Sequence, residues 1–465
     1  MVTDCGGPVD AITESSCLSE PGRGRARKNL QGGPQSSHGG LDDMKRPIPF
    51  RAAMAAACAL LALAGPAALA APDEQALCKD RGYPVGTPSQ WFFDECARVG
   101  SFTHQAEIPG LFRGQPNAMQ PAAEPMLLPA APQAPDYRWS IGQETGLTLD
   151  DYLARQRVMV LLVVRNGVLE VERYQYDRTA SHRFLSNSIA KTVTALAIGM
   201  AAQEGKLALD DRADRHAPAL AGTLYGEATV RQLLRMSSGA RFEERYDGKD
   251  DLARYGAAAL RGGAAAGAKV ITERAHAAGT VFNYASAETD MLALVLRGAT
   301  GQTLSQWLEP RLWQPLGAET SALWRAGADG LERAGGNLNA TARDWARLGV
   351  LLAHDGVRPD KPQLGPLLPQ DFLLEATDWK RHPEAFAPRK ATPYYGYGYQ
   401  VWTFPGAKRR FALLGVYGQA IYVDPEQKLV MVHMAANATA RAGQTSMGRE
   451  MGALWHAIIT HRGRW

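Results

Sequence analysis

Two apolar stretches flank a tight turn near residue 166. Residues 158–165 are almost entirely Val, Leu and Met, and residues 168–176 carry Val and Leu among polar side chains. The dipeptide between them, Asn166-Gly167, is the strongest short-range signal for a two-residue β-turn. The pattern therefore predicts a β-hairpin over residues 158–176.

Helical spacing of apolar residues predominates in the middle of the chain. The first such region, from about 188 to 204, is apolar on most of its surface, which is typical of a buried helix. In the region 341–356, Thr341 stands as N-cap and Asp344 three residues later. Further helices are predicted over 229–239, 286–301, 304–317 and 447–461, whereas the Ala/Gly-rich stretch 256–268 predicts a flexible or weakly helical insertion.

Strand-like alternation returns near the C-terminus, in residues 394–404, 410–424 and 428–436. The order along the chain is thus strands, many helices, more strands and a closing helix. Repeated βαβ units would give a different order. The pattern predicts an α+β protein, with an antiparallel sheet flanked by helices.

The chain begins with segments that are not expected to belong to this fold. Residues 44–70 have a basic start, a short Ala/Leu run and an A-x-A site ending at Ala70, which predicts a cleaved signal peptide and a periplasmic or secreted protein. Residues 1–43 show no structural period. A mis-assigned start, with translation beginning at Met44, is the simplest explanation; a disordered leader is the alternative.

The cysteines fit this division of the chain. Of the five, Cys5 and Cys17 lie in the leader and Cys58 in the signal peptide. Only Cys78 and Cys96 remain, and in an oxidising compartment they are expected to form a disulfide; two free buried thiols are the alternative.

Proline content divides the rest of the chain. Residues 71–115 are expected to form a small N-terminal segment, and the Pro/Ala-rich residues 116–135 a semi-rigid linker. The main domain is then expected over residues 136–465.

Composition narrows the possible functions. Hydrophobic residues make up 45% of the 465 residues, charged residues 21%, and the net charge is +4 without a long basic run in the last two thirds, so binding to nucleic acid is disfavoured. The signal-peptide apolar run is too short to span a bilayer, so the mature protein is expected to have no membrane span. The sequence has neither H-E-x-x-H nor G-x-S-x-G, and no metal or organic cofactor is implied.

The main candidate for chemistry is Ser188 with Lys191, in the stretch FLSNSIAKTVT. Residues three apart lie on one helical face, so the lysine amine can reach the serine hydroxyl. Burial and the positive end of the helix would lower the pKa of this lysine and let it act as a base. S-x-x-K is common by chance, and a capping serine with a surface lysine is the alternative. The apolar residues around Lys191 favour the first interpretation.

Several motifs, in order, resemble the serine β-lactamase and penicillin-binding-protein superfamily in its class C-like branch, which also holds esterases and 6-aminohexanoate-dimer hydrolases. The similarity covers roughly residues 150–460. The motifs that carry it are SNSIAKT, EGKLALDD, LLRMSSG, GTVFNYAS, TGQTLSQWLEPRLWQPLG, NATARDWARLG and GQAIYVDPEQ. The resemblance implies an all-helical subdomain beside the sheet, Ser188 as nucleophile and Lys191 as its base partner.

The resemblance also assigns roles to two later motifs. In GTVFNYAS, Tyr284 would be a phenolate base or a proton relay, and Ser286 stands where the family has Asn. In GVYGQAIYVD, the motif Lys-Thr-Gly or His-x-Gly is expected at 416–418, with Tyr417 in place of its middle residue. Gly418 would be retained, and the N–H of Gln419 would complete an oxyanion hole with that of Ser188.

The usual cation is missing from this third motif, which disfavours an efficient β-lactamase or carboxypeptidase. We therefore expect a secreted serine hydrolase acting on a small amide or ester through an acyl-enzyme, most like a 6-aminohexanoate-dimer-hydrolase-type amidase. A carboxylesterase or a weak β-lactamase or D-alanyl peptidase is the alternative. A non-catalytic peptidoglycan-binding relative is the alternative of another class. Aromatic residues in 394–404 are expected to pack beneath a helix rather than wall the cleft.

Overall fold

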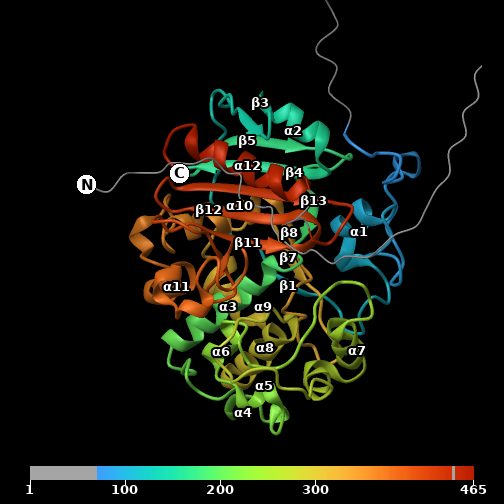
Figure 1. Cartoon of the computed structure of the whole chain (residues 1–465), viewed down its shortest axis with the longest axis vertical. Coiled ribbons are helices and arrows are strands. Elements are labelled where there is room, and N and C mark those ends of the chain that lie inside the picture. The colour runs from blue at the N-terminus through green and yellow to red at the C-terminus, as the bar shows by residue number, and fades with distance from the viewer. Residues whose placement is uncertain (1–70, 442–445) are drawn as a thin grey trace, which may run out of the picture. The chain divides into compact units, whose positions relative to one another are not determined.

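An antiparallel sheet forms the upper half of the molecule in Figure 1. The computed structural model describes residues 71–441 and 446–465, so the expectations for 1–43 and 44–70 lie outside the described residues. Within these ranges the sheet has the strand order β5-β4-β13-β12-β11-β10-β9. Its strands are β4 (Val158–Arg165), β5 (Val168–Tyr174), β9 (Gly396–Tyr397), β10 (Trp402–Thr403), β11 (Phe411–Gly415), β12 (Gln419–Asp424) and β13 (Leu429–Ala435). The hairpin predicted around Asn166-Gly167 is β4–β5.

Helices cover both faces of this sheet. On one face, α10 (Ala342–Ala353) packs on β4, β12 and β13, and on the other α12 (Ser446–Thr460) places Leu454, Trp455 and Ile458 against alternate residues of the same strands. Adjacent residues of β4 illustrate the alternation, because Leu162 belongs to the first core and Leu161 to the second. The predicted α+β class, with an antiparallel sheet flanked by helices, is confirmed.

A largely helical half lies below the sheet in Figure 1. Its central helices α3 (Ile189–Gln203) and α8 (Ser286–Thr300) pack against each other. Around them lie α4 (Ala213–His216), α5 (Leu224–Glu227), α6 (Val230–Leu234), α7 (Asp251–Lys269) and α9 (Leu304–Leu308). The remaining helices are α1 (Arg98–His104), α2 (Leu149–Arg155) and α11 (Gln370–Thr377).

The stretch 256–268, expected as a flexible or weakly helical insertion, is part of α7, which is interrupted at Gly262 and Gly263. Two of the strand-like stretches are each divided, and residues 394–404 contain the antiparallel pair β9 and β10. Residues 410–424 are not one strand but the antiparallel pair β11 and β12, joined by a tight turn at 416–418. The chain reverses there because Tyr417 and Gly418 adopt left-handed backbone angles, with φ of 61° and 88°.

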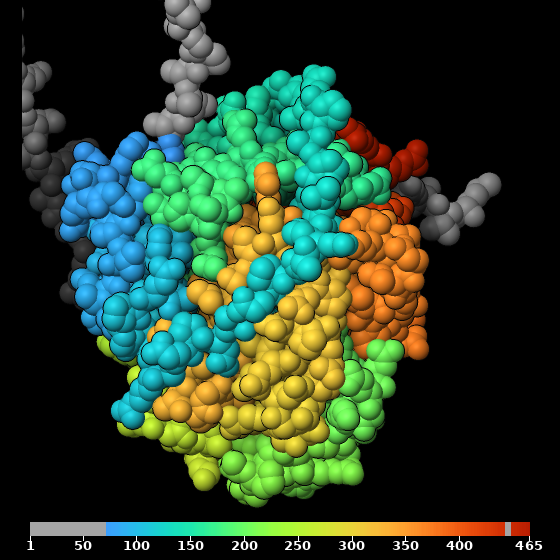
Figure 2. All heavy atoms as spheres, turned by 180° about the vertical axis from the view of Figure 1, so that it is seen from behind, coloured from blue at the N-terminus to red at the C-terminus, as the bar shows by residue number. Residues whose placement is uncertain are grey.

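The stretch 116–135, expected as a linker, lies along the back of the molecule as the cyan band in Figure 2. Its strand β1 (Asn117–Met119) is the edge of a second sheet of order β1-β7-β8-β6, with β6 (Arg183–Leu185), β7 (Ala322–Trp324) and β8 (Leu338–Thr341). Further on, Met126 donates its N–H to the carbonyl of Gly317 at 2.9 Å. A third, two-stranded sheet follows, with β2 (Trp139–Ile141) and β3 (Glu144–Leu147).

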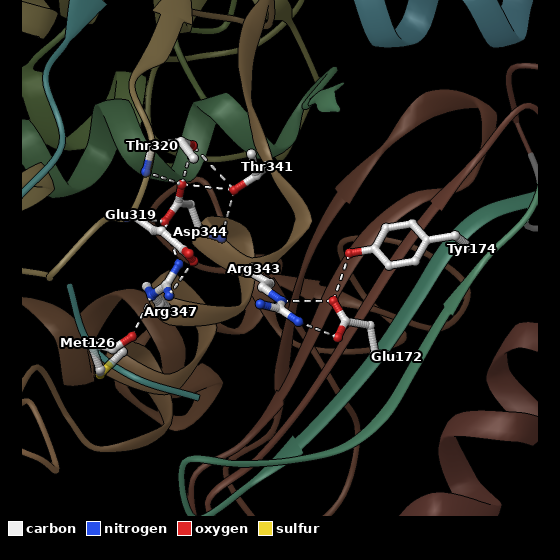
Figure 3. Close-up of polar contacts among 9 residues, drawn as sticks. All are labelled: Met126, Glu172, Tyr174, Glu319, Thr320, Thr341, Arg343, Asp344 and Arg347. Atoms are coloured by element: carbon white, nitrogen blue, oxygen red, sulfur yellow. Dashed lines mark hydrogen bonds and ion pairs between the residues drawn. The ribbon is translucent and has the colours of Figure 1, made fainter. Parts of the chain in front are cut away.

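Figure 3 shows the polar cluster that holds this stretch to α10. Arg347 donates to the carbonyl of Met126 at 2.7 Å and to the fully buried carboxylate of Asp344 at 2.8 Å. Asp344 also accepts from Thr341, the N-cap of α10, whose hydroxyl accepts from the Asp344 N–H as predicted. The cluster therefore ties the helix start and the 116–135 stretch together.

The N-terminal segment 71–115 contains the expected disulfide. Cys78 and Cys96 are bonded, with 5.1 Å between their Cα atoms. Helix α1, which begins two residues after Cys96, packs on β6. In the described part of the chain, we find no helix with both the length and the apolar character needed to cross a bilayer.

Candidate active site

The start of α3 brings the two main candidate residues together. Ser188 is the N-cap residue of this helix, but its hydroxyl makes no capping bond to the helix backbone. Instead the hydroxyl accepts a hydrogen bond from Lys191 Nζ at 2.9 Å. Ser188 is partly exposed, whereas Lys191 is 1% exposed. The geometry does not fit the alternative of a capping serine followed by a surface lysine.

The Lys191 side chain is buried and makes hydrogen bonds to Ser188 and Gly335. Burial lowers the pKa of its amine to about 8, although the carboxylates of Glu244 and Asp290 act in the opposite direction. Lys191 Nζ also donates to the carbonyl of Gly335 at 2.6 Å, which orients the amine toward Ser188. Gly335 is packed closely here, because an added Cβ would lie 3.2 Å from the carbonyl oxygen of Ser286.

Tyr284 completes this group from the segment before α8. The Lys191 amine lies 5.1 Å from the centre of its ring, and the pKa of Tyr284 responds to a hydrogen bond with Ser188. Burial, supported by the nearby Glu244 carboxylate, raises the pKa of the Tyr284 phenol above its ordinary value. The phenol is therefore neutral near pH 7, which favours a proton relay over a phenolate base.

Ser286 faces a carboxylate that the sequence analysis did not identify. Both its N–H and its hydroxyl donate to Glu244, at 2.8 Å and 2.7 Å. Glu244 is 5% exposed and also accepts from the hydroxyl of Tyr246. It lies in a loop without periodicity, so only its tertiary contacts reveal it.

The third motif lies in the turn between β11 and β12, and the strand end just before this turn approaches Ser188. The residue against the Ser188 amide is Gly415, where an added Cβ would lie 3.0 Å from Ser188 N and 2.7 Å from the carbonyl oxygen of Ser186. Asn187, the residue before Ser188, donates its side-chain amide to the carbonyl of Val416 at 3.0 Å. The turn is thus attached to the segment that contains Ser188 through residues 415–416.

The three residues expected to act in this turn have other contacts. Gly418 abuts Asn437, with 2.5 Å between an added Cβ and the Asn437 Nδ2. The Tyr417 ring packs between Phe92 and Phe102 of the N-terminal segment. The Gln419 side chain bonds to backbone atoms, including the carbonyl of Ala435 at 2.7 Å. The turn formed at 416–418 hid this arrangement in the sequence, where the alternation continues without a break.

Two more residues at the site come from distant parts of the chain. Trp402 of β10 stacks on Tyr284 with 5.4 Å between ring centres, so the aromatic stretch contributes to the site as well as to packing. Tyr397 and Tyr399, in contrast, are buried as expected. Arg441 donates to the carbonyl of Glu244, and its guanidinium lies 5.9 Å from the Tyr246 ring centre.

The described residues contain no group of three or more His, Cys, Asp or Glu side chains placed to hold a metal ion. What the site does contain is a serine hydroxyl in contact with a buried amine and close to a neutral phenol. Such a group can transfer a proton from the hydroxyl while it attacks a carbonyl carbon.

Two proteins described as 6-aminohexanoate-dimer hydrolases are similar to this chain. A curated 6-aminohexanoate-dimer hydrolase of Paenarthrobacter ureafaciens is 26% identical over 315 residues, which cover 66% of this chain and 80% of that protein. A Bacillus anthracis structure, described as a proposed 6-aminohexanoate-dimer hydrolase, has a TM-score of 0.69 and 26% identity, over 82% of this chain and 98% of that one.

A more distant structure shares the fold alone. This protein from Bacteroides dorei, described as a proposed β-lactamase, has a TM-score of 0.51 and 17% identity over 67% of this chain and 96% of that one. The family model named Beta-lactamase matches residues 148–448, well over half of the chain. This protein therefore belongs to the beta-lactamase family.

Proposed function

We propose that the protein is a serine hydrolase that cleaves an amide or ester through an acyl-enzyme, with Ser188 as nucleophile. The observation that carries the proposal is the 2.9 Å contact between Ser188 Oγ and a buried Lys191 amine whose pKa is lowered to about 8. About a tenth of such an amine is neutral at pH 7, and this neutral form can accept the serine proton.

In the proposed reaction, Ser188 Oγ attacks the substrate carbonyl carbon while its proton passes to Lys191. The tetrahedral intermediate collapses, the bond to the amine or alcohol breaks, and Lys191 and Tyr284 deliver the proton to that leaving group. Water then attacks the acyl-enzyme with the same groups acting in reverse, which releases the acid and restores Ser188.

The oxyanion is proposed to bind two backbone N–H groups. One is that of Ser188, which begins α3. For the second, the position of Gly415 against the Ser188 amide favours the N–H of Val416 over that of Gln419, the donor expected from the sequence.

The proposed substrate is a linear amide, because the two similar proteins described above are named as hydrolases of the 6-aminohexanoate dimer. A carboxylesterase is the second candidate, and the partly exposed aromatic surface of Trp402 beside Tyr284 suits an apolar acyl or alcohol group equally well. A non-catalytic role is disfavoured, because it would leave the energetic cost of burying Lys191 unexplained.

Acylation read by intact mass tests the proposal. The full chain is treated with a fluorophosphonate and should gain one adduct, which should vanish in Ser188→Ala and persist in Ser181→Ala, an exposed serine just before β6. An unmodified wild type, or an adduct that survives Ser188→Ala, contradicts the proposal. Rates on p-nitrophenyl esters and short linear amides then distinguish esterase from amidase.

We also propose that the protein is exported. The Cys78–Cys96 disulfide supports this, because such bonds persist in oxidising compartments. N-terminal sequencing of protein recovered from the periplasm or medium should find Ala71 or a near neighbour, whereas an intact Met1 contradicts cleavage after Ala70.

A further inference from the structure

The N-terminal segment 71–115 lies outside the family match, which begins at residue 148, yet it contacts three parts of the candidate active site. Its Arg98 and Phe92 contact the turn at 416–418, Phe92 also faces Tyr246, and Gln105 bonds to the stretch after Gly335. We propose that Arg98 is a positioning residue that holds the turn 415–418 against Ser188. This inference rests on the proposed function.

Arg98 is unusual because it is a buried cation with backbone and ring partners. It is 2% exposed, and no ion pair of its guanidinium is recorded in the described ranges. Burial lowers the pKa of this guanidinium from its ordinary value. A buried charge that is not directly paired is costly, so its polar contacts must be specific to be retained.

The guanidinium of Arg98 contacts Tyr417 in the turn and Asn437, which lies just after β13. Its Nη1 donates to the carbonyl of Asn437 at 2.9 Å, and its plane lies 4.5 Å from the ring centre of Tyr417. These two partners bind each other as well, because the Asn437 N–H donates to the Tyr417 carbonyl at 3.2 Å. Arg98 therefore contacts both Tyr417 of the turn and the residue that binds the Tyr417 carbonyl.

The turn transmits this constraint to the nucleophile over a short path. Val416 precedes Tyr417 and accepts a hydrogen bond from Asn187, and Gly415 abuts the Ser188 amide. Phe92 adds apolar support, with its ring edge-on to Tyr417 at 5.1 Å. A shift of this turn by a fraction of an ångström would displace the proposed second oxyanion donor.

Gln105, seven residues after Arg98, contacts the stretch that follows Gly335. Its side chain donates to Asn337 at 2.7 Å and accepts from Asn339 at 3.0 Å. Asn337 follows Gly335 and Gly336, and the Gly335 carbonyl orients Lys191. The same segment thus braces the oxyanion side and the base side of the proposed site.

The experiment compares Arg98, the first residue of α1, with Arg178, which binds α1 through Thr103. Arg98→Met removes the contact with the turn. Arg178→Met is the matched control, because Arg178 donates to Thr103 of α1 at 2.8 Å and its pKa is also lowered by burial, but its recorded contacts are with Tyr83, Thr103 and Tyr176. Both variants are measured as full chains for fluorophosphonate acylation rate, for kcat and KM on a p-nitrophenyl ester, and for Tm.

We expect Arg98→Met to lower the acylation rate and kcat by about 10- to 100-fold with little change in KM, since a misplaced donor weakens binding of the transition state and not of the substrate. Arg178→Met should lower Tm with near-wild-type kcat, and Arg98→Lys should recover part of the rate. If Arg98→Met does not fold, Phe92→Leu replaces it with the same expected direction. A wild-type acylation rate in Arg98→Met, or in Phe92→Leu where it replaces that variant, overturns the inference. Equal losses in Arg98→Met and Arg178→Met also overturn it.

The proposed function is judged separately in this experiment. Ser188→Ala must abolish the adduct while wild type forms it. If wild type forms no adduct, the proposed function fails. If wild type reacts and the Arg98 variants react equally fast, only the role of Arg98 fails.

Discussion

The starts of α3 and α8 each bury a titratable side chain, and burial acts on the two in opposite directions. It lowers the pKa of the Lys191 amine to about 8 and raises the pKa of the Glu288 carboxyl to about 8. Lys191 contacts the partly exposed Ser188, whereas Glu288 accepts from the fully buried Ser238 at 2.6 Å. A shifted pKa therefore marks a reactive site only where the group also meets an accessible partner.

The largest expected effect comes from removing the amine at α3. Lys191→Met should lower kcat/KM on a p-nitrophenyl ester by about 10²- to 10⁴-fold, because the serine loses its proton acceptor. Lys206→Met, at an exposed lysine just after the same helix, should leave kcat/KM unchanged. A fully active Lys191→Met would show that Lys191 is not the proton acceptor of Ser188.

The carboxyl at α8 should affect stability instead. Glu288 stays neutral in the folded protein up to about pH 8, while in the unfolded chain it ionises near 4.5. The raised folded pKa means that its contribution to stability is full below the unfolded pKa and is lost as pH rises through the folded one.

Glu288→Gln, measured by urea unfolding, should remove this part of the pH dependence. The variant should be more stable relative to wild type at pH 9 than at pH 5, with little change in kcat. Glu384→Gln, at an exposed carboxylate, provides the control. A constant stability difference at the two pH values would show that Glu288 is ionised in the folded protein.

The pH dependence of wild-type activity tests the protonation state of the Lys191 amine without a substitution. Because Lys191 accepts a proton only when neutral, kcat/KM of the wild type should rise with pH through an apparent pKa of about 8. Initial rates from pH 6 to pH 10 on a neutral ester measure it. A profile that is flat across this range would assign the base to another group.

The smallest expected effect is a shift of that profile. The carboxylate of Glu244 raises the pKa of Lys191, so Glu244→Gln should move the apparent pKa lower. Glu243→Gln, the exposed neighbour, should leave the profile in place. A shift to higher pH in Glu244→Gln would contradict the assigned electrostatics.

Local spacing predicted the part of the site that lies on one helix. Ser188 and Lys191 are three residues apart, so helix geometry alone brings them together. The antiparallel sheet was likewise predictable, because each strand carries its own alternation and the Asn166-Gly167 turn is explicit in the sequence. The role of Tyr284 came from the resemblance to a family and stays a proposal.

Features set by distant contacts could not be predicted in this way. The turn at 416–418 depends on a left-handed Tyr417, a conformation that residue type does not favour, so Gly415 was overlooked. Glu244 is defined by bonds to Ser286, which follows it by 42 residues. The proline-rich stretch 116–135 resembles a linker in composition, yet its proline-free strand β1, which starts just after Pro116, pairs at the edge of a sheet.

The contacts of Arg98 also bear on the order in which the chain folds. The Cys78–Cys96 disulfide joins residues 18 apart and can close as soon as the first part of the chain is available. Arg98 and its partner Asn437 are 339 residues apart, so this bond must wait for nearly the whole chain. The N-terminal segment thus combines contacts that can form early, such as those of α1 with β6, with one that a chain ending before Asn437 cannot make.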